Sequence, residues 1–349
     1  MLFTQEERPL DIIPVGRIAI DFNPTDMNRP LSQSEHFNKY LGGSPANIAV
    51  GMARLGRKVG FLARISDDAF GDFVEGFFRN EGIDVSHVKR CVNGEKLGLT
   101  FTEILSPTQS SILMYREGVA DLMLHPDDVD EAYVASSKSL LISGTSLCCS
   151  PTREAALKAL TFAQRHDVTV IFDADYRAYT WKNKDEISIY TSLVAQKSDI
   201  ILGSREEFDL MERLLGLDGT DKASAAYWLG QGAKLLVIKH GKEGSMAYTA
   251  EESWKVKPFP VAAMKGFGGG DGYASACLHG LMTGRSLPEA LEMGAMPAPR
   301  ICPARTRWRR SSGRRRSNTV PWSAAFEKAV CLEIHLATFE KERYRTCKP

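Results

Sequence analysis

Short apolar runs alternate with longer amphipathic stretches over most of the chain. Apolar runs bounded by glycine or polar residues predict strands, and apolar residues three or four positions apart predict helices. The expected strands are 12–20, 59–63, 140–143, 169–173, 200–202 and 235–239. The expected helices are 46–55, 70–81, 152–166, 205–214, 223–230, 272–281 and 287–293. This alternation predicts an α/β fold, a doubly wound and mostly parallel sheet flanked by helices.

Two stretches depart from the alternation. Residues 97–104 and 111–115 predict consecutive strands joined around Ser106, and residues 18–40 form a polar interval between a strand and a helix. Together, about 18–40 and about 97–116 predict a small β-sheet that covers the larger sheet as a lid. We expect the whole α/β domain to span residues 10–294.

Composition excludes several classes of protein. The chain has 349 residues, 44 Lys+Arg against 43 Asp+Glu and 43% hydrophobic residues, which excludes disordered and fibrous classes. No apolar run approaches the ~20 residues that cross a bilayer, and the first residues lack a secretory pattern. The seven cysteines form no CxxC pair, which argues against a zinc site or a disulfide framework. We therefore expect a cytoplasmic protein with no membrane partner.

The C-terminal segment 295–349 is rich in arginine and proline. Residues 293–349 hold 13 Lys+Arg against 4 Asp+Glu, and eight of the 17 residues from Arg300 to Arg316 are arginines. An arm that binds nucleic acid is one interpretation. Few aromatic residues accompany the arginines and no binding module is recognisable, so a nucleic-acid partner is disfavoured. A disordered tail and an out-of-frame translation are the other two interpretations.

A glycine cluster opens the predicted helix 272–281. It consists of Gly268, Gly269 and Gly270, followed by Asp271. Free N–H groups and the positive end of the helix dipole make a helix start an anion site, and glycine lets phosphate approach closely. A carboxylate there repels phosphate, but it is well placed to take the proton of a hydroxyl that attacks phosphate. The alternative is a glycine-rich turn with Asp271 as an ordinary helix cap.

A second glycine pair precedes the predicted helix 46–55. Gly42 and Gly43 stand just before this helix, and Asn47 falls in its first turn. The amide of Asn47 offers a donor and an acceptor to a ligand that carries several hydroxyls. A Gly-Gly hinge beside a surface asparagine is the alternative.

Polar residues and a glycine also follow the ends of predicted strands. In chain order, they are Asp21, Asp175, Glu207 and Gly241. Ligands of open α/β sheets bind beyond the carboxyl ends of the strands. We therefore expect these residues to gather at one edge of the sheet.

Taken together, these motifs resemble those of the ribokinase-like carbohydrate kinases, the PfkB family. Gly42, Gly43 and Asn47 match the family's early Gly-Gly-x-x-x-Asn segment, and residues 64–71 resemble its Gly-x-Asp-x-x-Gly stretch. Residues 268–271 correspond to its late Gly-Ala-Gly-Asp signature. The similarity spans roughly residues 10–294.

The resemblance implies a ribokinase-like fold with a small β-sheet lid and ATP-dependent phosphorylation of a sugar hydroxyl. Asp271 would be the catalytic base. The N–H groups of the glycine cluster would form the anion hole for the transferred phosphoryl group; the residues are Gly268, Gly269 and Gly270. The sugar would be held by Asp21, Gly42, Gly43 and Asn47.

The resemblance also implies a nucleotide site with Mg²⁺. Glu207 matches the glutamate of the family's Asn-x-x-Glu motif, which positions Mg²⁺ through water, and Ser204 stands in place of the Asn. Lys239, Gly241 and Gly244 belong to the stretch that borders the nucleotide. A monovalent cation near the nucleotide and a homodimer formed through the lid are further expectations from relatives.

Several segments resemble a subfamily that phosphorylates the terminal O6 hydroxyl of 5-dehydro-2-deoxygluconate. They are residues 173–181, 203–209 and 115–117. This substrate carries a carboxylate, for which a guanidinium is the natural bidentate partner, so Arg116 and Arg177 are expected to bind it. Three alternatives stay open: a 2-keto-3-deoxygluconate kinase, another sugar kinase of the family, and a non-catalytic sugar-binding protein of the same fold.

Overall fold

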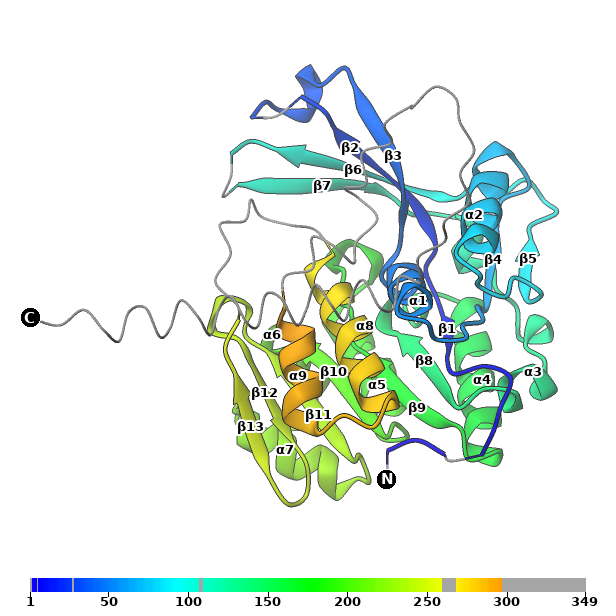
Figure 1. Cartoon of the computed structure of the whole chain (residues 1–349). Helices are drawn as coiled ribbons and strands as arrows, with labels where there is room; N and C mark the ends of the chain where they lie inside the picture. The colour runs from blue at the N-terminus through cyan, green and yellow to red at the C-terminus, as the bar shows by residue number, and fades with distance from the viewer. Residues whose placement is uncertain (1, 5, 27, 107–108, 259–267, 297–349) are drawn as a thin grey trace, which may run out of the picture.

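A computed structural model describes residues 2–4, 6–26, 28–106, 109–258 and 268–296. Within these residues, the largest sheet has seven strands in the order β1-β8-β9-β10-β11-β12-β13 (Figure 1). Five strands are parallel: β1 (Ile13–Val15), β8 (Ser139–Ser143), β9 (Thr169–Asp173), β10 (Ile200–Ser204) and β11 (Leu235–Lys239). Two antiparallel strands complete one edge: β12 (Ser245–Tyr248) and β13 (Ser253–Val256).

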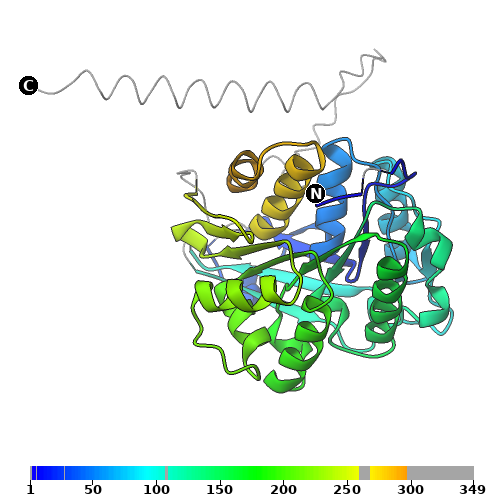
Figure 2. The same ribbon diagram turned by 90° about the horizontal axis from the view of Figure 1, so that it is seen from below.

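Helices cover both faces of this sheet, which confirms the doubly wound architecture (Figure 2). One layer contains α1 (Ser44–Arg54), α2 (Ala69–Asn80), α8 (Gly269–Met282) and α9 (Leu287–Ala295). The other contains α3 (Glu131–Ala135), α4 (Thr152–Arg165), α5 (Lys184–Ala195), α6 (Arg205–Glu212) and α7 (Asp221–Gly230). Leu141 packs in the first core and its neighbour Leu140 in the second, because successive side chains of a strand point to opposite faces.

A smaller sheet stands at one end of the large one (Figure 1). Its strand order is β3-β2-β6-β7. The strands are β2 (Ala19–Pro24), β3 (Phe37–Gly42), β6 (Gly98–Ile104) and β7 (Ser110–Tyr115). β2 pairs antiparallel with β3 and parallel with β6, and β6 pairs antiparallel with β7. The small sheet that the sequence predicted is therefore present.

Two expected strands differ from the structure. The apolar run 12–20 is divided between β1 and β2, which belong to different sheets. The division falls at Gly16, whose φ of 138° lies outside the strand region. The expected strand 59–63 contributes isolated bridges, from Val59 to Ile12 just before β1 and from Leu62 to Val15 of β1. The chain then enters β4 (Ala63–Ile65), which pairs with β5 (Val88–Arg90).

The motif at residues 64–71 contains the start of α2. The carboxylate of Asp68 accepts hydrogen bonds from the backbone N–H groups of Phe70 at 3.0 Å and Gly71 at 3.2 Å. Asp68 is thus the N-cap of α2 and satisfies donors that the helix itself leaves free.

The arginine- and proline-rich segment 295–349 lies almost wholly outside the described residues, which end at Met296. Lys265 and Gly266 also lie outside them. No helix of the described part is long and apolar enough to span a membrane.

Candidate active site

The start of α1 lies against the end of β1 and the beginning of β2. Gly43 adopts a φ of 102°, and a Cβ at this position would overlap the backbone carbonyl of Arg17. A Cβ on Gly42 would overlap the carboxylate of Asp21. Gly43 therefore requires glycine, because only a residue without a side chain permits this close approach to the backbone, whereas a side chain at Gly42 would displace the carboxylate of Asp21.

The start of α8 lies beside that of α1, and the two helices pack side by side (Figures 1 and 2). Gly268 is the N-cap in the left-handed conformation, with a φ of 80°. The first N–H groups of a helix have no acceptor within it, which here applies to Gly269, Gly270 and Asp271. This helix start therefore has the free N–H donors that the predicted anion site would need.

The carboxylate of Asp271 is held by two donors from α1. The hydroxyl of Ser44 donates to Oδ1 at 2.7 Å, and the side-chain amide of Asn47 donates to Oδ2 at 2.9 Å. Burial raises the pKa of Asp271, and the negative charge of Asp175 raises it further, while the two hydrogen bonds lower it. The result is a fixed carboxylate that binds a proton more readily than an ordinary aspartate.

Two cavities meet at the start of α8. A cavity of about 110 Å³ is lined by residues that include Asp21, Gly43, Ser44, Asn47, Arg177, Gly268 and Asp271. A cavity of about 360 Å³ is lined by residues that include Lys239, Gly241, Gly244, Gly269, Gly270 and Tyr273. Gly270 and Asp271 are consecutive residues that line different cavities. The first helical turn of α8 therefore forms the boundary between them.

Buried charges surround this boundary. Burial, with Asp175, Glu207 and Asp271 nearby, raises the pKa of Asp173 to about 7, against the opposing effect of Lys239. The ammonium of Lys239 lies 3.8 Å from Asp173 Oδ1. Burial lowers the pKa of Lys239, but the surrounding carboxylates outweigh it and raise the pKa overall. Lys239 therefore stays protonated beside the second cavity.

Glu207 is fixed by a capping box at the start of α6. Its Oε2 accepts the backbone N–H of Ser204 at 2.6 Å, and the Ser204 hydroxyl accepts the N–H of Glu207 at 3.3 Å. Its Oε1 accepts the N–H of Tyr176 at 2.8 Å. Ser204 and Glu207 do not line either cavity with their own atoms. They act in the structure by fixing the loop after β9 to the start of α6.

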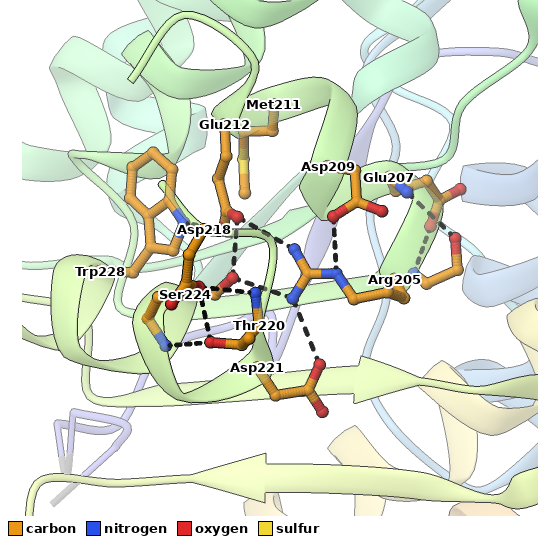
Figure 3. Close-up of polar contacts among 12 residues, drawn as sticks. Arg205, Glu207, Asp209, Met211, Glu212, Asp218, Thr220, Asp221, Ser224 and Trp228 are labelled. Atoms are coloured by element: carbon orange, nitrogen blue, oxygen red, sulfur yellow. Dashed lines mark hydrogen bonds and ion pairs between the residues drawn. The ribbon is translucent and has the colours of Figure 1, made fainter. Parts of the chain in front are cut away.

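A polar network behind Glu207 ties α6 to α7 (Figure 3). Arg205 donates to Glu212 Oε2 and to the hydroxyl of Ser224, both at 2.9 Å, and pairs with Asp221 at 3.2 Å. Glu212 also accepts the indole N–H of Trp228 at 2.9 Å. His240, which follows β11, lies 2.7 Å from Asp221. The network therefore connects the loop beside the larger cavity to two helix starts.

Arg116 is not brought to the cavity. Its guanidinium donates to Asp121 Oδ2 at 2.7 and 3.1 Å and to the carbonyl of Thr145 at 2.8 Å. The side chain of Arg116 is 3% exposed and that of Asp121 is fully buried. These partners occupy the guanidinium. We therefore correct the expectation that Arg116 binds substrate: its role is structural, and it links the end of β7 to the loop after β8.

Sequence reasoning did not identify Arg17 and Ser44, which both line the smaller cavity. Ser44 stands between Gly43 and Pro45, and nothing in its spacing distinguishes it from an ordinary helix start. Arg17 could have been noticed, because it is the single charged residue within the apolar run 12–20. Among the described residues, three polar atoms of this cavity are buried without a hydrogen-bond partner: Arg17 Nε, Asp21 Oδ1 and Asn47 Oδ1.

Known proteins are similar to this chain in sequence and in fold. The chain is 62% identical over 294 residues to a 5-dehydro-2-deoxygluconokinase of Clostridium perfringens, covering 84% of this chain and 87% of that protein. It is 51% identical over 294 residues to one of Geobacillus kaustophilus, covering 84% and 88%. A PfkB protein from Polaromonas sp. matches with a TM-score of 0.73 at 30% identity, covering 82% and 93%. The family model described as pfkB family carbohydrate kinase matches residues 10–298, and the chain belongs to this family.

Proposed function

We propose that this protein transfers the γ-phosphoryl group of ATP to the terminal O6 hydroxyl of 5-dehydro-2-deoxygluconate. The observation that carries the proposal is the boundary between the two cavities, where Gly270 faces one and Asp271 faces the other. A sugar in the smaller cavity and a nucleotide in the larger one would meet at this helix start. Relatives up to 62% identical that are named 5-dehydro-2-deoxygluconokinase support the choice of substrate.

Asp271 acts as the general base. It accepts the proton of the O6 hydroxyl as that oxygen attacks the γ-phosphorus. The new O6–P bond forms while the bond from phosphorus to the β–γ bridging oxygen breaks, and ADP leaves with that oxygen. Ser44 and Asn47 hold the carboxylate in one orientation through their bonds at 2.7 and 2.9 Å. A fixed base removes part of the entropy barrier to the transfer.

The start of α8 and Lys239 stabilise the transferred group. The N–H groups of Gly269 and Gly270 have no acceptor within the helix and line the larger cavity. Gly268 lines the smaller cavity, and as the N-cap of α8 it orients the N–H groups of Gly269 and Gly270. Lys239 adds a positive charge, and its Nζ lies 3.7 Å from the place where a Cβ on Gly270 would stand. Fixed donors of this kind favour the charge that develops in the transition state.

The buried carboxylates fit a magnesium ion that is held mainly by the nucleotide. No group of three or more His, Cys, Asp or Glu residues in the described part of the chain forms a metal cage. Mg²⁺ commonly keeps several waters and binds through phosphates and one or two carboxylates. Asp173 and Glu207, which lie close enough to interact, would hold such an ion, Glu207 through water. When bound, the ion neutralises charge on the phosphates.

The smaller cavity supplies groups for a polyhydroxylated acid. Asp21 Oδ1 and Asn47 Oδ1 are buried acceptors without a partner in the described chain, which sugar hydroxyls would satisfy. Gly42 and Gly43 let the junction of β3 and α1 approach Asp21 and Arg17 closely. Gly43 lines the cavity, and Arg177 adds a positive charge to it. Gly241 and Gly244 line the larger cavity, where they would border the nucleotide. Ser204 supports this nucleotide site by capping α6.

Three finer points belong to the same proposal. We expect the enzyme to act in the cytoplasm and to respond to a monovalent cation near the nucleotide. We also expect a homodimer through the small sheet, where Leu113 and Tyr115 of β7 are 46% and 57% exposed. Sedimentation of the wild type beside a Leu113→Ser, Tyr115→Ser double variant tests the dimer. A wild-type monomer would contradict it.

The activity is tested with the full-length protein, ATP and Mg²⁺ in a coupled assay of ADP release. The acceptors are 5-dehydro-2-deoxygluconate, 2-keto-3-deoxygluconate, fructose and ribose. We expect turnover with the first to exceed the others by at least about tenfold in kcat/KM. Preference for another sugar would change the substrate and keep the mechanism. Sugar binding without any ADP release would favour a non-catalytic protein.

A further inference from the structure

Arg17 is a buried cation without an ion-pair partner among the described residues. The residue is 5% exposed, and its Nη2 donates to the hydroxyl of Thr100 at 2.8 Å. Its Nε has no acceptor in the described part of the chain. A buried charge is strongly disfavoured unless it is paired and hydrogen-bonded. The free protein therefore holds a guanidinium whose hydrogen bonding is incomplete.

Arg116, another buried arginine of this region, is an example of a guanidinium whose charge and N–H groups have partners. Arg116 is paired with Asp121 and also donates to the Thr145 carbonyl. Arg177, on the cavity wall, is paired with Asp175 at 2.7 Å and donates to the carbonyl of Tyr176 at 2.7 Å. Arg17 differs from both, because its one side-chain hydrogen-bond partner within the described residues is the neutral hydroxyl of Thr100.

Arg17 reaches the same cavity as the base. It lies between β1 and β2, where the chain passes from the large sheet to the small one. The side chain lines the cavity together with Asp21, Asn47 and Asp271. Arg17 and Asp271 therefore line one cavity of about 110 Å³. A ligand whose hydroxyl faces Asp271 would also contact Arg17.

The charged groups that face Arg17 leave it free for an anion. Asp121 and Asp175 lie nearby, but each is paired with another arginine. Asp21 also lies nearby, and burial raises its pKa, against the effect of Arg17 itself. A carboxyl that is readily protonated repels an incoming anion less than an ordinary aspartate does.

We propose that Arg17 binds the carboxylate of the sugar-acid substrate and makes the site select acids over neutral sugars. This inference rests on the proposed function, because it names the group that recognises the acid. The free Nε and the adjacent N–H groups of a guanidinium form the planar fork that carboxylates accept in two parallel bonds. Arg17 also supplies the charge that Arg116, occupied by Asp121, does not offer.

The test compares Arg17→Gln with the wild type on two acceptors. One is 5-dehydro-2-deoxygluconate, and the other is its neutral analogue with a primary alcohol in place of the carboxylate. We expect the ratio of kcat/KM for acid over neutral acceptor to fall on the order of 100-fold in the variant. KM for ATP should stay within about twofold of the wild-type value, because the larger cavity does not include Arg17.

Arg116→Gln is the matched control. It removes a buried guanidinium that already has partners, so thermal stability should fall while the ratio for acid over neutral acceptor is retained. Arg17→Lys keeps the charge without the planar fork, and Thr100→Val keeps the arginine but removes its acceptor. If Arg17→Gln does not fold, a tenfold or larger fall of the ratio in Arg17→Lys supports the proposal, and Thr100→Val is expected to show a smaller fall.

Three results would overturn the inference, and they differ from one another. An unchanged ratio in the folded Arg17 variants, with wild-type turnover of the acid, would remove the role of Arg17 alone. A collapse of the ratio in Arg177→Gln but not in Arg17→Gln would assign the carboxylate to Arg177. Wild-type turnover of neutral sugars without turnover of the acid would refute the proposed function together with the role of Arg17.

Discussion

Asn47 donates its side-chain amide to the carboxylate of Asp271 at 2.9 Å, although the two residues stand 224 positions apart in the chain. The bond joins the first turn of α1 to the first turn of α8. It couples the two glycine motifs into one site, because the motif that lines the smaller cavity also orients the carboxylate of Asp271. The acceptor of the same side chain, Asn47 Oδ1, has no hydrogen-bond partner among the described residues and is free to accept from a ligand.

We predict that turnover depends most strongly on Asp271, the proposed general base. Asp271→Asn keeps the shape of the side chain but removes its ability to accept the O6 proton, so kcat should fall by about 10²- to 10⁴-fold. Sugar affinity, measured by calorimetry, should change little, because the cavity keeps its other lining residues. Near-normal turnover in this variant would show that another group takes the proton.

The bond from Asn47 sets the pH dependence of the base. Burial raises the pKa of Asp271, while hydrogen bonds from Asn47 and Ser44 lower it by stabilising the carboxylate. The base works only when deprotonated, so kcat/KM should fall as the pH decreases through this raised pKa. Asn47→Ala removes a stabilising donor, and the acid limb of the pH profile should move to higher pH.

Two further variants, one expected to shift the acid limb and one control, accompany that measurement. Ser44→Ala removes the other donor, whose hydroxyl lies 2.7 Å from Asp271, and should move the limb in the same direction. Thr102→Ala changes the same cavity without a bond to Asp271, because its hydroxyl donates to Asn23 at 2.6 Å. The role of Asn47 is refuted if Asn47→Ala and Thr102→Ala give the same acid limb as the wild type.

Asp173 should make the folded chain less stable as the pH increases. Burial raises the pKa of Asp173 to about 7 from its ordinary value of 3.8. Between these values the folded chain retains a proton that the unfolded chain has lost, so its contribution to stability decreases with pH. The free energy of unfolding relative to Asp173→Asn should fall by at most about 1.4 kcal/mol per pH unit across this window.

Urea denaturation from about pH 5 to about pH 8 measures this difference. Asp218→Asn serves as the control, because hydrogen bonds from Thr220 lower the pKa of that exposed carboxyl. Its contribution is complete above the ordinary pKa and is lost only in more acidic solution, so it should show no trend in this range. A constant difference between the wild type and Asp173→Asn would contradict the raised pKa.

The network of Figure 3 should contribute to stability through one buried charge. Glu212 is 4% exposed, and Arg205 is its cationic partner at 2.9 Å. Arg205→Met leaves that carboxylate with neutral donors only and should lower the free energy of unfolding by about 3 kcal/mol. Arg213→Met breaks an exposed pair with Asp185 and should change it by less than about 1 kcal/mol. Equal losses in denaturant melts would show that burial of the pair is unimportant.

Local signals were sufficient for the five parallel strands of the large sheet, for most helices and for the two glycine motifs. Apolar runs such as 200–202 and 235–239 lie in β10 and β11, because a strand covered on both faces must be apolar along its length. The helix α5 was not predicted from the sequence. The short helix α3 and the antiparallel strands β12 and β13 were also missed. The residues of β13 are mostly exposed and carry no apolar run.

Residue types at short spacings are enough to identify the family, the glycine motifs and Asp271. Which side chains share a cavity depends instead on how distant segments pack together. The tertiary structure placed Arg116 in a closed ion pair with Asp121 and brought Arg17 and Ser44 to the site. Such pairings depend on how β1, β2, β6 and α1 pack across more than one sheet. Local pattern carries no record of those long-range contacts, since each is fixed only when distant segments are buried together.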